Sequence, residues 1–408
     1  MVTVASVLRY RKLIVTGNIL MMICTGFLYT WSVFVTPLET EMEWTRVQTS
    51  MAYTFAAIFN VLGSLVAAFL NKWLNRKKIV RLAGFTTCLG FILASYASQP
   101  WHLYVYYGIL MSASLGMVYN SIIVTIVSWY PEKSGMISGI LLMCFGFAGI
   151  LFSSAANTVI ATFGWRGTFV LFGVLFFLLF EAFAFCVKGP SPKETAVLPA
   201  TLQINQQTTN RNVSSLNMIK TLPFWLFAFW VIMIAAVGLT LSSYASPIAQ
   251  SMNISSSIAA FYAGLVSVGS GSGRLFSGMI YDRRGLNAVL FSSLIAICGG
   301  LLLFLSYNRQ LSVLLGISFF LIGMGFGGSP VCTTGFVKTT YGEVNYGINL
   351  SIATLPVLVA SYVGPYLAGI IYQMAGYHLV CIAIIVYAMI SLLFAVLLQK
   401  VTAESRSN

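Results

Sequence analysis

Long uninterrupted runs of apolar residues are the feature of this 408-residue sequence that most restricts its fold. A bilayer core about 30 Å thick is crossed by about 20 apolar residues in a helix, whereas barrel strands alternate over about ten residues. Only helices and closed barrels satisfy their backbone hydrogen bonds in lipid, so continuous runs predict an all-α membrane protein with twelve spanning helices. The twelve runs cover residues 13–36, 47–70, 79–98, 102–128, 135–160, 167–188, 223–250, 257–280, 287–306, 311–336, 345–373 and 378–400.

The composition agrees with a chain that lies mostly in lipid. Hydrophobic residues make up 58% of the sequence and charged residues only 8%, a balance that no water-soluble globular domain tolerates on its surface. The first run follows basic residues, as in a secretory signal, but many runs come after it, so we predict a retained helix. All seven cysteines lie within the runs without disulfide or metal spacing, and no metal site or cofactor is predicted.

One long polar segment divides the sequence into two halves. Residues 189–221 are rich in Pro, Gln and Asn, which is typical of a flexible linker. Six apolar runs precede this segment and six follow it. We therefore predict a six-helix bundle at 1–188, a cytoplasmic linker at 189–221 and a second six-helix bundle at 222–408.

The distribution of Lys and Arg predicts the orientation in the membrane. With a cytoplasmic N-terminus, 18 of the 22 basic residues fall in inner loops, the linker or the tails, and three fall in outer loops. Cytoplasmic loops carry this excess of positive charge, so both termini are expected in the cytoplasm. The net charge of +13 then arises at lipid headgroups, and no nucleic-acid partner is predicted. The remaining basic residue, Arg274, lies inside the run 257–280.

Arg274 is therefore a permanent positive charge within a predicted span. An unpaired charge in the bilayer costs between about 3 and about 10 kcal/mol, so such a residue faces a cavity or a partner. Of the nine acidic residues, Glu181 alone lies within a span. Two interpretations stay open, an ion pair with Glu181 and a substrate carboxylate bound by two parallel hydrogen bonds. The glycines and serines that alternate over 269–273 fit either ligand space or close helix packing.

Four other polar side chains lie in the middle of predicted spans, namely Tyr29, Tyr119, Asn120 and Asn349. The two tyrosines are too deep to be interface anchors, and each needs a partner for its hydroxyl group. The two asparagines are further candidates for substrate binding, or alternatively form interhelical hydrogen bonds worth about 1 kcal/mol each.

Two loops at equivalent places in the halves carry related motifs. "SGMIYDRRG", Ser277 to Gly285, matches the signature Gly-x-x-x-Asp-Arg-x-Gly, whereas "AAFLNKWLNRKK" has Asn71 where an acid is expected and Leu74 where a glycine is expected. This signature and the two halves of six helices resemble the major facilitator superfamily. The resemblance implies two pseudo-symmetric six-helix bundles around a site at the membrane midplane.

Five motifs, spread over both halves, resemble one branch of that superfamily, the oxalate:formate antiporter and monocarboxylate transporter families. They are "GFLYTWSVF" (26–34), "GMVYN" (116–120), "WYPEKSGMISG" (129–139), "GRLFSGMIYDRRG" (273–285) and "YGEVNYGINLS" (341–351). The resemblance implies that Arg274 binds the substrate carboxylate. It also implies that Tyr29 and Tyr119 line the opposite wall of the cavity.

The departures from this branch predict the substrate. The oxalate-exchanging member carries a lysine in the eleventh helix, but residues 349–361 contain no Lys, Arg or His. One fixed positive charge suits one carboxylate, so we predict a secondary transporter of monocarboxylates such as lactate, pyruvate or formate. An anion exchanger of the oxalate and formate type is the alternative, and a carboxylate sensor that does not transport is less favoured. No catalytic set or Walker sequence is present, so no enzyme is predicted.

The expected partners are the carboxylate, protons and the lipid bilayer, with the carrier acting as a monomer in the plasma membrane. Animal monocarboxylate carriers have an aspartate four residues before the helix-8 arginine, where this sequence has Ser270. Proton coupling then runs either through Glu181 as the carrier or through a substrate that crosses in its protonated form.

Asp282, the only aspartate of the sequence, ends the span that contains Arg274. A helix is expected to begin near Gly135, and its positive N-terminal end would attract this carboxylate. The resemblance implies that such a contact joins the two halves at the cytoplasmic side. The predicted gating residues are Gly278, Asp282, Arg283 and Gly285. A loop ion pair with Arg283 or Arg284, worth less than about 1 kcal/mol, is the alternative.

Overall fold

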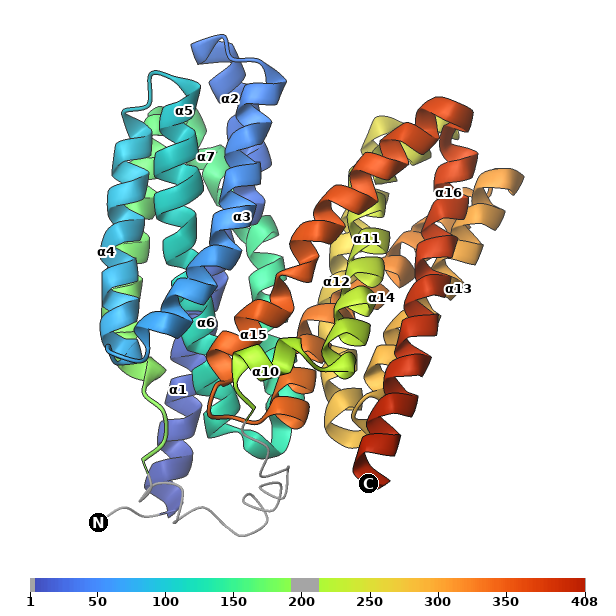
Figure 1. Cartoon of the computed structure of the whole chain (residues 1–408). Coiled ribbons are helices and arrows are strands. Elements are labelled where there is room, and N and C mark those ends of the chain that lie inside the picture. Colours follow the sequence, from blue (N-terminus) through green and yellow to red (C-terminus); the bar gives the residue numbers. More distant parts are fainter. Residues whose placement is uncertain (1–3, 192–212, 408) are drawn as a thin grey trace. The chain divides into compact units, whose positions relative to one another are not determined.

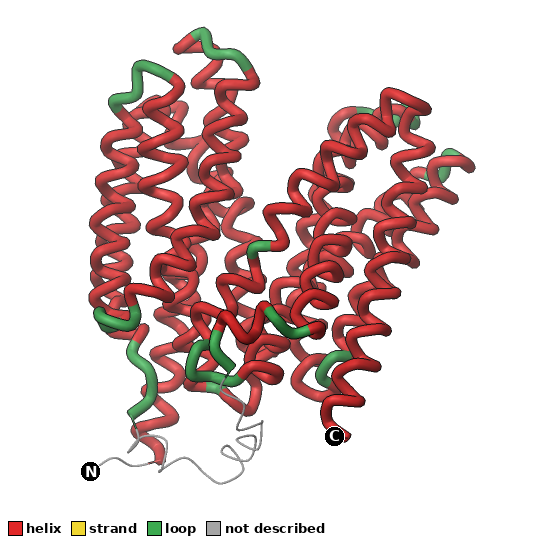
Figure 2. The backbone as a smooth tube through the Cα atoms, in the orientation of Figure 1, coloured by secondary structure: helices red, strands yellow, loops and turns green. Residues whose placement is uncertain are grey.

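The computed structural model describes residues 4–191 and 213–407, and these residues form helices joined by short loops (Figure 2). The all-helical fold agrees with the apolar runs of the sequence. Of the predicted linker 189–221, residues 192–212 lie outside the described part. Its last residues contain the short helix α10 (Ser215–Ile219).

The chain forms two compact units. The first is drawn from Met1–Glu132 and Cys144–Gln207, and the second from Lys133–Met143 and Thr208–Asn408. The start of the longest helix of the first half, Lys133–Met143, therefore packs with the second unit. The boundaries predicted from the sequence follow chain order alone, so they assign residues 133–143 to the first bundle.

Two helices of the first unit begin at a capping residue. Thr45 accepts a hydrogen bond from the backbone of Gln48 to start α3, and Asn75 accepts one from Lys78 at 2.9 Å to start α4. The elements are α1 (Val4–Thr25), η1 (Gly26–Thr30), α2 (Trp31–Met42), α3 (Arg46–Leu70), α4 (Arg76–Ser95), α5 (Pro100–Leu103), η2 (Tyr104–Met111), α6 (Ser112–Trp129), η3 (Pro131–Lys133), α7 (Ser134–Phe183) and η4 (Ala184–Val187). Of these, α7 contributes to both units.

In the second unit α11, α12, α13, α14 and α16 pack beside one another (Figure 1). Their bounds are α11 (Leu222–Ser251), α12 (Ser256–Arg284), α13 (Asn287–Arg309), α14 (Ser312–Tyr341), α15 (Tyr346–Thr354) and α16 (Pro356–Ser407). Glycines with positive φ end α12 at Gly285 and α14 at Gly342, and another turns the chain at Gly376 within α16.

Among the described residues, ten helical stretches are long and apolar enough to span a membrane. One of them, Ser134–Val187, contains a break at Gly164, where φ is 68° and ψ is 174°. The helix α12 is not among the ten, because its serines, glycines and arginine lower its hydropathy. The predicted count of twelve spans and the cytoplasmic position of both termini therefore stay predictions.

The two units have different packing cores. In the first, the buried ring of Phe27 contacts five other phenylalanine rings, with centroid distances of 4.9–6.0 Å. In the second, α12 and α14 approach so closely that a Cβ on Gly269 or Gly273 would overlap a carbonyl group of α14. Close packing therefore accounts for these two glycines, and the ligand-space interpretation of them is not needed.

Candidate functional site

Arg274 lies in α12, within the second unit, and is only 6% exposed. Its Nη1 atom donates a hydrogen bond to the carbonyl of Leu142, in the part of α7 that packs with this unit. A Cβ on Gly139 would lie 2.6 Å from the Arg274 carbonyl, so the two backbones nearly touch. Close contact between α7 and α12 thus fixes the position of the guanidinium group.

The other edge of the guanidinium group has no hydrogen-bond partner in the part of the chain that the structure describes. Among the described residues Nε has no hydrogen-bond partner, and Nη1 is the one nitrogen with a bond to protein. Buried polar atoms are almost always satisfied by protein or by ordered water. The edge formed by Nε and Nη2 has the donor geometry that matches a carboxylate bidentately.

Ser270 lies one helical turn before Arg274 on the same face of α12. Its side chain is 7% exposed, and its Oγ atom has no hydrogen-bond partner among the described residues. Two unsatisfied buried groups, a cation and a hydroxyl, are therefore adjacent on one helix. In the sequence Ser270 stands out as one of the small residues of 269–273 and as the replacement for an acid, and its spacing of four residues from Arg274 was a further usable signal.

Glu181, the acid that the sequence offered as a partner for Arg274, has another partner. Its Oε2 atom lies 3.0 Å from Nε of Arg81 in α4, and both side chains are partly exposed. The ion pair belongs entirely to the first unit. The ion-pair interpretation of Arg274 thus loses its main support.

A second buried cation of the second unit is already neutralised. Lys338 is 6% exposed near the end of α14, and its Nζ atom lies 3.5 Å from Oε1 of Glu343. Of these two cations, Arg274 is the one without a carboxylate partner among the described residues.

Asn349 is fully buried in α15, but its amide group is engaged with the end of the linker. Nδ2 donates to the carbonyl of Val213 at 3.2 Å, and Oδ1 accepts from Oγ of Ser215 at 2.7 Å. Asn345 adds a third contact to Val213 at 3.4 Å. The two asparagines hold the chain entering α10 against α15, which is a structural role that the position in the sequence did not reveal.

The other three predicted binding residues belong to the first unit. Asn120 is 4% exposed and donates to Oγ of Ser64 at 3.2 Å, so it joins α6 to α3. Tyr119 is half-buried, with its ring 5.6 Å from that of Phe145. Tyr29 lies in η1, and its side chain is outside the described part of the structure. These three residues therefore belong to a different unit from Arg274.

Asp282 caps the start of α7. Its Oδ1 accepts from the backbone N–H of Gly135 and its Oδ2 from that of Met136, both at 2.7 Å. Gly278, one turn earlier, packs directly on the Gly135 carbonyl, where no side chain would fit. The helix ends at Gly285, whose φ of 54° favours glycine, and the adjacent Arg283 is exposed. This contact is the one that the charge of a helix N-terminus predicts.

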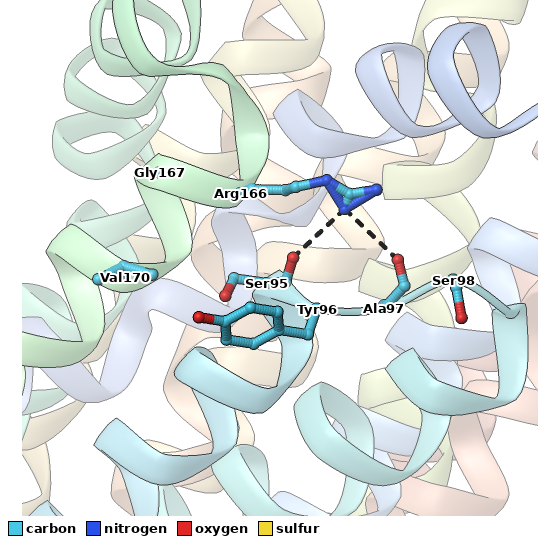
Figure 3. A pocket seen from close by; sticks show the side chains of 7 residues that line it. All are labelled: Ser95, Tyr96, Ala97, Ser98, Arg166, Gly167 and Val170. Carbon is cyan, nitrogen blue, oxygen red and sulfur yellow. Dashed lines mark hydrogen bonds between the residues drawn. The ribbon is translucent and has the colours of Figure 1, made fainter.

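A pocket of about 440 Å³ in the first unit surrounds another arginine, Arg166 (Figure 3). Its guanidinium group donates to the carbonyls of Ser95 and Ala97, at 3.3 and 3.5 Å, and pairs with Glu41 at 3.5 Å. It also lies over the ring of Trp165. Because these partners satisfy Arg166, this pocket is a weaker candidate for an anion site than the surroundings of Arg274. The described residues contain no group of three or more His, Cys, Asp or Glu placed to hold a metal ion.

Comparison with known proteins identifies the family. The model of the Major Facilitator Superfamily matches residues 14–354. An uncharacterized MFS-type transporter of Escherichia coli K12, YhjX, is 23% identical over 354 residues, covering 85% of each chain. The oxalate:formate antiporter of Oxalobacter formigenes is 23% identical over 82% of this chain and 79% of its own. Human monocarboxylate transporter 12 is 23% identical over 95% of this chain and 81% of its own.

Solved structures of other transporters have the same fold. The solved structure of the proton:xylose symporter XylE superimposes with a TM-score of 0.73 over 96% of both chains, at 15% identity. The predicted resemblance to oxalate:formate antiporters and monocarboxylate transporters is thus confirmed at low identity. The chain is a multi-pass integral membrane protein and not an enzyme, and it belongs to the major facilitator superfamily of transporters.

Proposed function

We propose that this protein is a secondary active transporter of small monocarboxylate anions, of the lactate, pyruvate and formate class, that works by alternating access in the plasma membrane. The observation that carries the proposal is the unpaired edge of Arg274, a buried guanidinium group with no carboxylate partner among the described residues. A bound carboxylate would supply the two acceptors that this edge lacks. Ser270, on the same face of α12, would donate one further hydrogen bond to the bound carboxylate.

The charge of the site explains why binding would drive the transport cycle. A cavity that holds a lone cation in a low-dielectric surrounding is costly, and a monoanion neutralises it. The neutral complex then favours the occluded state through which the carrier must pass in alternating access. A dianion would leave one negative charge uncompensated, since Lys338 is already paired with Glu343.

Tyr29 and Tyr119 remain proposed ligands from the first unit, on the strength of the family resemblance. For Asn120 and Asn349, substrate binding is the alternative and interhelical hydrogen bonding the favoured role, because their amide groups already hold Ser64 and Val213. Asp282, Gly278, Arg283 and Gly285 are proposed to gate the cytoplasmic side. Opening there would require Asp282 to leave the start of α7.

Proton coupling is proposed to use Glu181 or a substrate that crosses in its protonated form. The first route requires the Glu181–Arg81 pair to open whenever the carboxylate takes up a proton. Exchange of oxalate and formate is the second candidate function, and it is favoured by the similarity to the antiporter of Oxalobacter formigenes. We propose that the carrier acts as a monomer.

Counterflow in proteoliposomes tests the substrate class. Vesicles loaded with unlabelled lactate, pyruvate, formate or oxalate would take up the same radiolabelled compound, with and without a pH gradient. The proposal predicts accumulation of at least one monocarboxylate in preference to oxalate. Preference for oxalate would instead support the exchanger and refute the single-cation interpretation of Arg274.

A further inference from the structure

A pocket of about 510 Å³ opens at the N-terminal end of α4, entirely within the first unit. Its lining includes three basic side chains, Arg76 and Lys77 from the first turn of α4 and Lys188 from the end of η4. Asn71, which stands where the loop motif has an acid in the other half, also lines it. Among the described residues the lining includes no Asp or Glu, so this part of the chain supplies three positive charges to the pocket and no negative one.

The arginine of this pocket is held without a counter-charge. Arg76 is half-buried, and no described carboxylate lies within ion-pair distance of it. Its Nη1 atom sits so near Gly189 that a Cβ there would lie 3.3 Å away. The guanidinium group is therefore confined beside Gly189, in a pocket that Lys188 also lines, and the two like charges favour a bound anion.

One wall of the pocket is fixed by side-chain donors. Three successive carbonyl groups at the end of η4 each accept a hydrogen bond: Cys186 from Asn18 at 3.0 Å, Val187 from Thr125 at 3.1 Å, and Lys188 from Trp129 at 2.7 Å. These donors come from α1 and α6, which pack together. The backbone that presents Lys188 is therefore preorganised before any ligand binds.

Another part of the lining is the N-terminus of a 20-residue helix, α4. The first N–H groups of a helix have no partner within it, and they attract anions together with the helix dipole. Asn75 satisfies the N–H of Lys78, whereas those of Arg76 and Lys77 have no acceptor among the described residues. The pocket lining thus combines the first turn of a helix, in which two N–H groups have no acceptor among the described residues, with three cationic side chains.

Two exposed aromatic side chains lie in the pocket lining or in the turn that precedes α4. Phe185 lines it and is 38% exposed, and Trp73, in the turn before α4, is 76% exposed. Exposed aromatic residues of membrane proteins gather at the level of the headgroups. We propose that this pocket binds a phosphate group, supplied by the headgroup of an anionic phospholipid.

Lipid titration of the full-length protein in neutral detergent tests the proposal. The bound lipids are counted by native mass spectrometry as phosphatidylglycerol or phosphatidylcholine is added, and a parallel series uses inorganic phosphate. We expect tighter binding of phosphatidylglycerol than of phosphatidylcholine. We expect each basic residue that contacts the phosphate to contribute about fivefold in affinity, so Arg76→Gln with Lys188→Gln should weaken this binding by about 25-fold.

The matched control is Lys72→Gln, which removes the same charge from an exposed residue of the neighbouring turn that does not line the pocket. It should bind phosphatidylglycerol within about twofold of the wild type, since a residue outside the pocket contributes mainly through the screened surface potential. Asn71→Asp, which adds a carboxylate to the lining, should weaken binding as the double variant does.

Competition separates the two sources of phosphate. If millimolar inorganic phosphate displaces phosphatidylglycerol, the pocket recognises phosphate from either source; if it does not, the lipid is the specific ligand. Both outcomes support the proposed chemistry. Equal binding of the two lipids, or an unchanged affinity in a double variant that melts at the wild-type temperature, would overturn it.

Discussion

Asn349 illustrates how a residue's partners decide between two roles that its position leaves open. A buried asparagine in the middle of an apolar run fits both substrate binding and interhelical hydrogen bonding. In the structure its amide joins Val213 and Ser215, which lie more than a hundred residues away in the sequence. No local pattern marks such a partner, and the same is true of Asn120 and Ser64.

Asn349→Ala should loosen the start of the second unit without weakening substrate binding. Loss of two hydrogen bonds, each worth about 0.5–1.5 kcal/mol, should speed amide hydrogen exchange across Val213–Lys220. The half-saturating substrate concentration in counterflow should stay within about twofold of the wild type. Weaker substrate binding with unchanged exchange would instead assign Asn349 to the binding site.

Arg274 could be singled out from the sequence because a permanent charge within an apolar run must face a cavity or a partner. Counting the nine acids left Glu181 as its one candidate partner within a span, and the structure shows that Glu181 pairs with Arg81 instead. The hydrogen bond from Arg274 to Leu142 could not be predicted from the sequence, because every residue offers a carbonyl group and only the packing of α7 on α12 selects this one. Ser270 and Arg274 share a face for the simple reason that four residues make about one helical turn.

The contact between α7 and α12 is the element-level feature with the most specific sequence requirement. Gly135 and Gly278 bring the two backbones together, which lets Asp282 reach two N–H groups at the start of α7. Charge-assisted hydrogen bonds of this kind are about twice as strong as neutral ones. A side chain at Gly278 would separate the helices and break both bonds.

Gly278→Ala should therefore lower the melting temperature of the purified protein, with overpacking costing about 1–3 kcal/mol. Gly264→Ala is the matched control, since it lies in the same helix with nothing within 4 Å of the added Cβ. There the substitution should be neutral or stabilising, because alanine favours helices by about 0.5–1 kcal/mol over glycine. Equal melting temperatures for the two variants would contradict the close contact.

Helices were predictable as elements because apolar runs and short polar breaks mark them directly. The boundary between the runs 135–160 and 167–188 corresponds to the break at Gly164, and Pro356 begins α16 after the short α15. The division into units was less predictable. Residues 133–143 pack with the second unit. The contact of Asp282 with the start of α7 was predicted from the charge of a helix N-terminus, whereas the close approach of Gly139 to Arg274 was not.

At the scale of the whole molecule, topology depends on whether α12 crosses the membrane. It carries Arg274, yet its polar residues keep it out of the ten apolar stretches found among the described residues. We predict that it does cross, so that reporter fusions after Asn253 and after Leu286 lie on opposite sides. A cytoplasmic fluorescent reporter should be active at Leu286 and silent at Asn253. Activity at both positions would remove Arg274 from the membrane interior.

Coupling to protons is also a property of the whole carrier. If Glu181 carries the proton, Glu181→Gln should lose stimulation of uptake by a pH gradient while keeping counterflow, because exchange needs no net proton movement. Arg81→Gln removes the partner but leaves the carboxylate, so it should keep the stimulation. Stimulation that survives Glu181→Gln would make the ion pair structural and assign the proton to the substrate.

Counterflow of radiolabelled lactate, pyruvate and formate by the Arg274→Gln variant tests the central claim most directly. Arg309→Gln is the matched control, since it removes an exposed arginine from the end of α13 in the same unit. Arg274→Lys keeps the charge but loses the planar edge, and should raise the half-saturating concentration by about tenfold or more. We predict that Arg274→Gln abolishes saturable counterflow at an unchanged melting temperature, while Arg309→Gln retains it. Saturable counterflow of a monocarboxylate by Arg274→Gln, at wild-type affinity, would contradict the assignment.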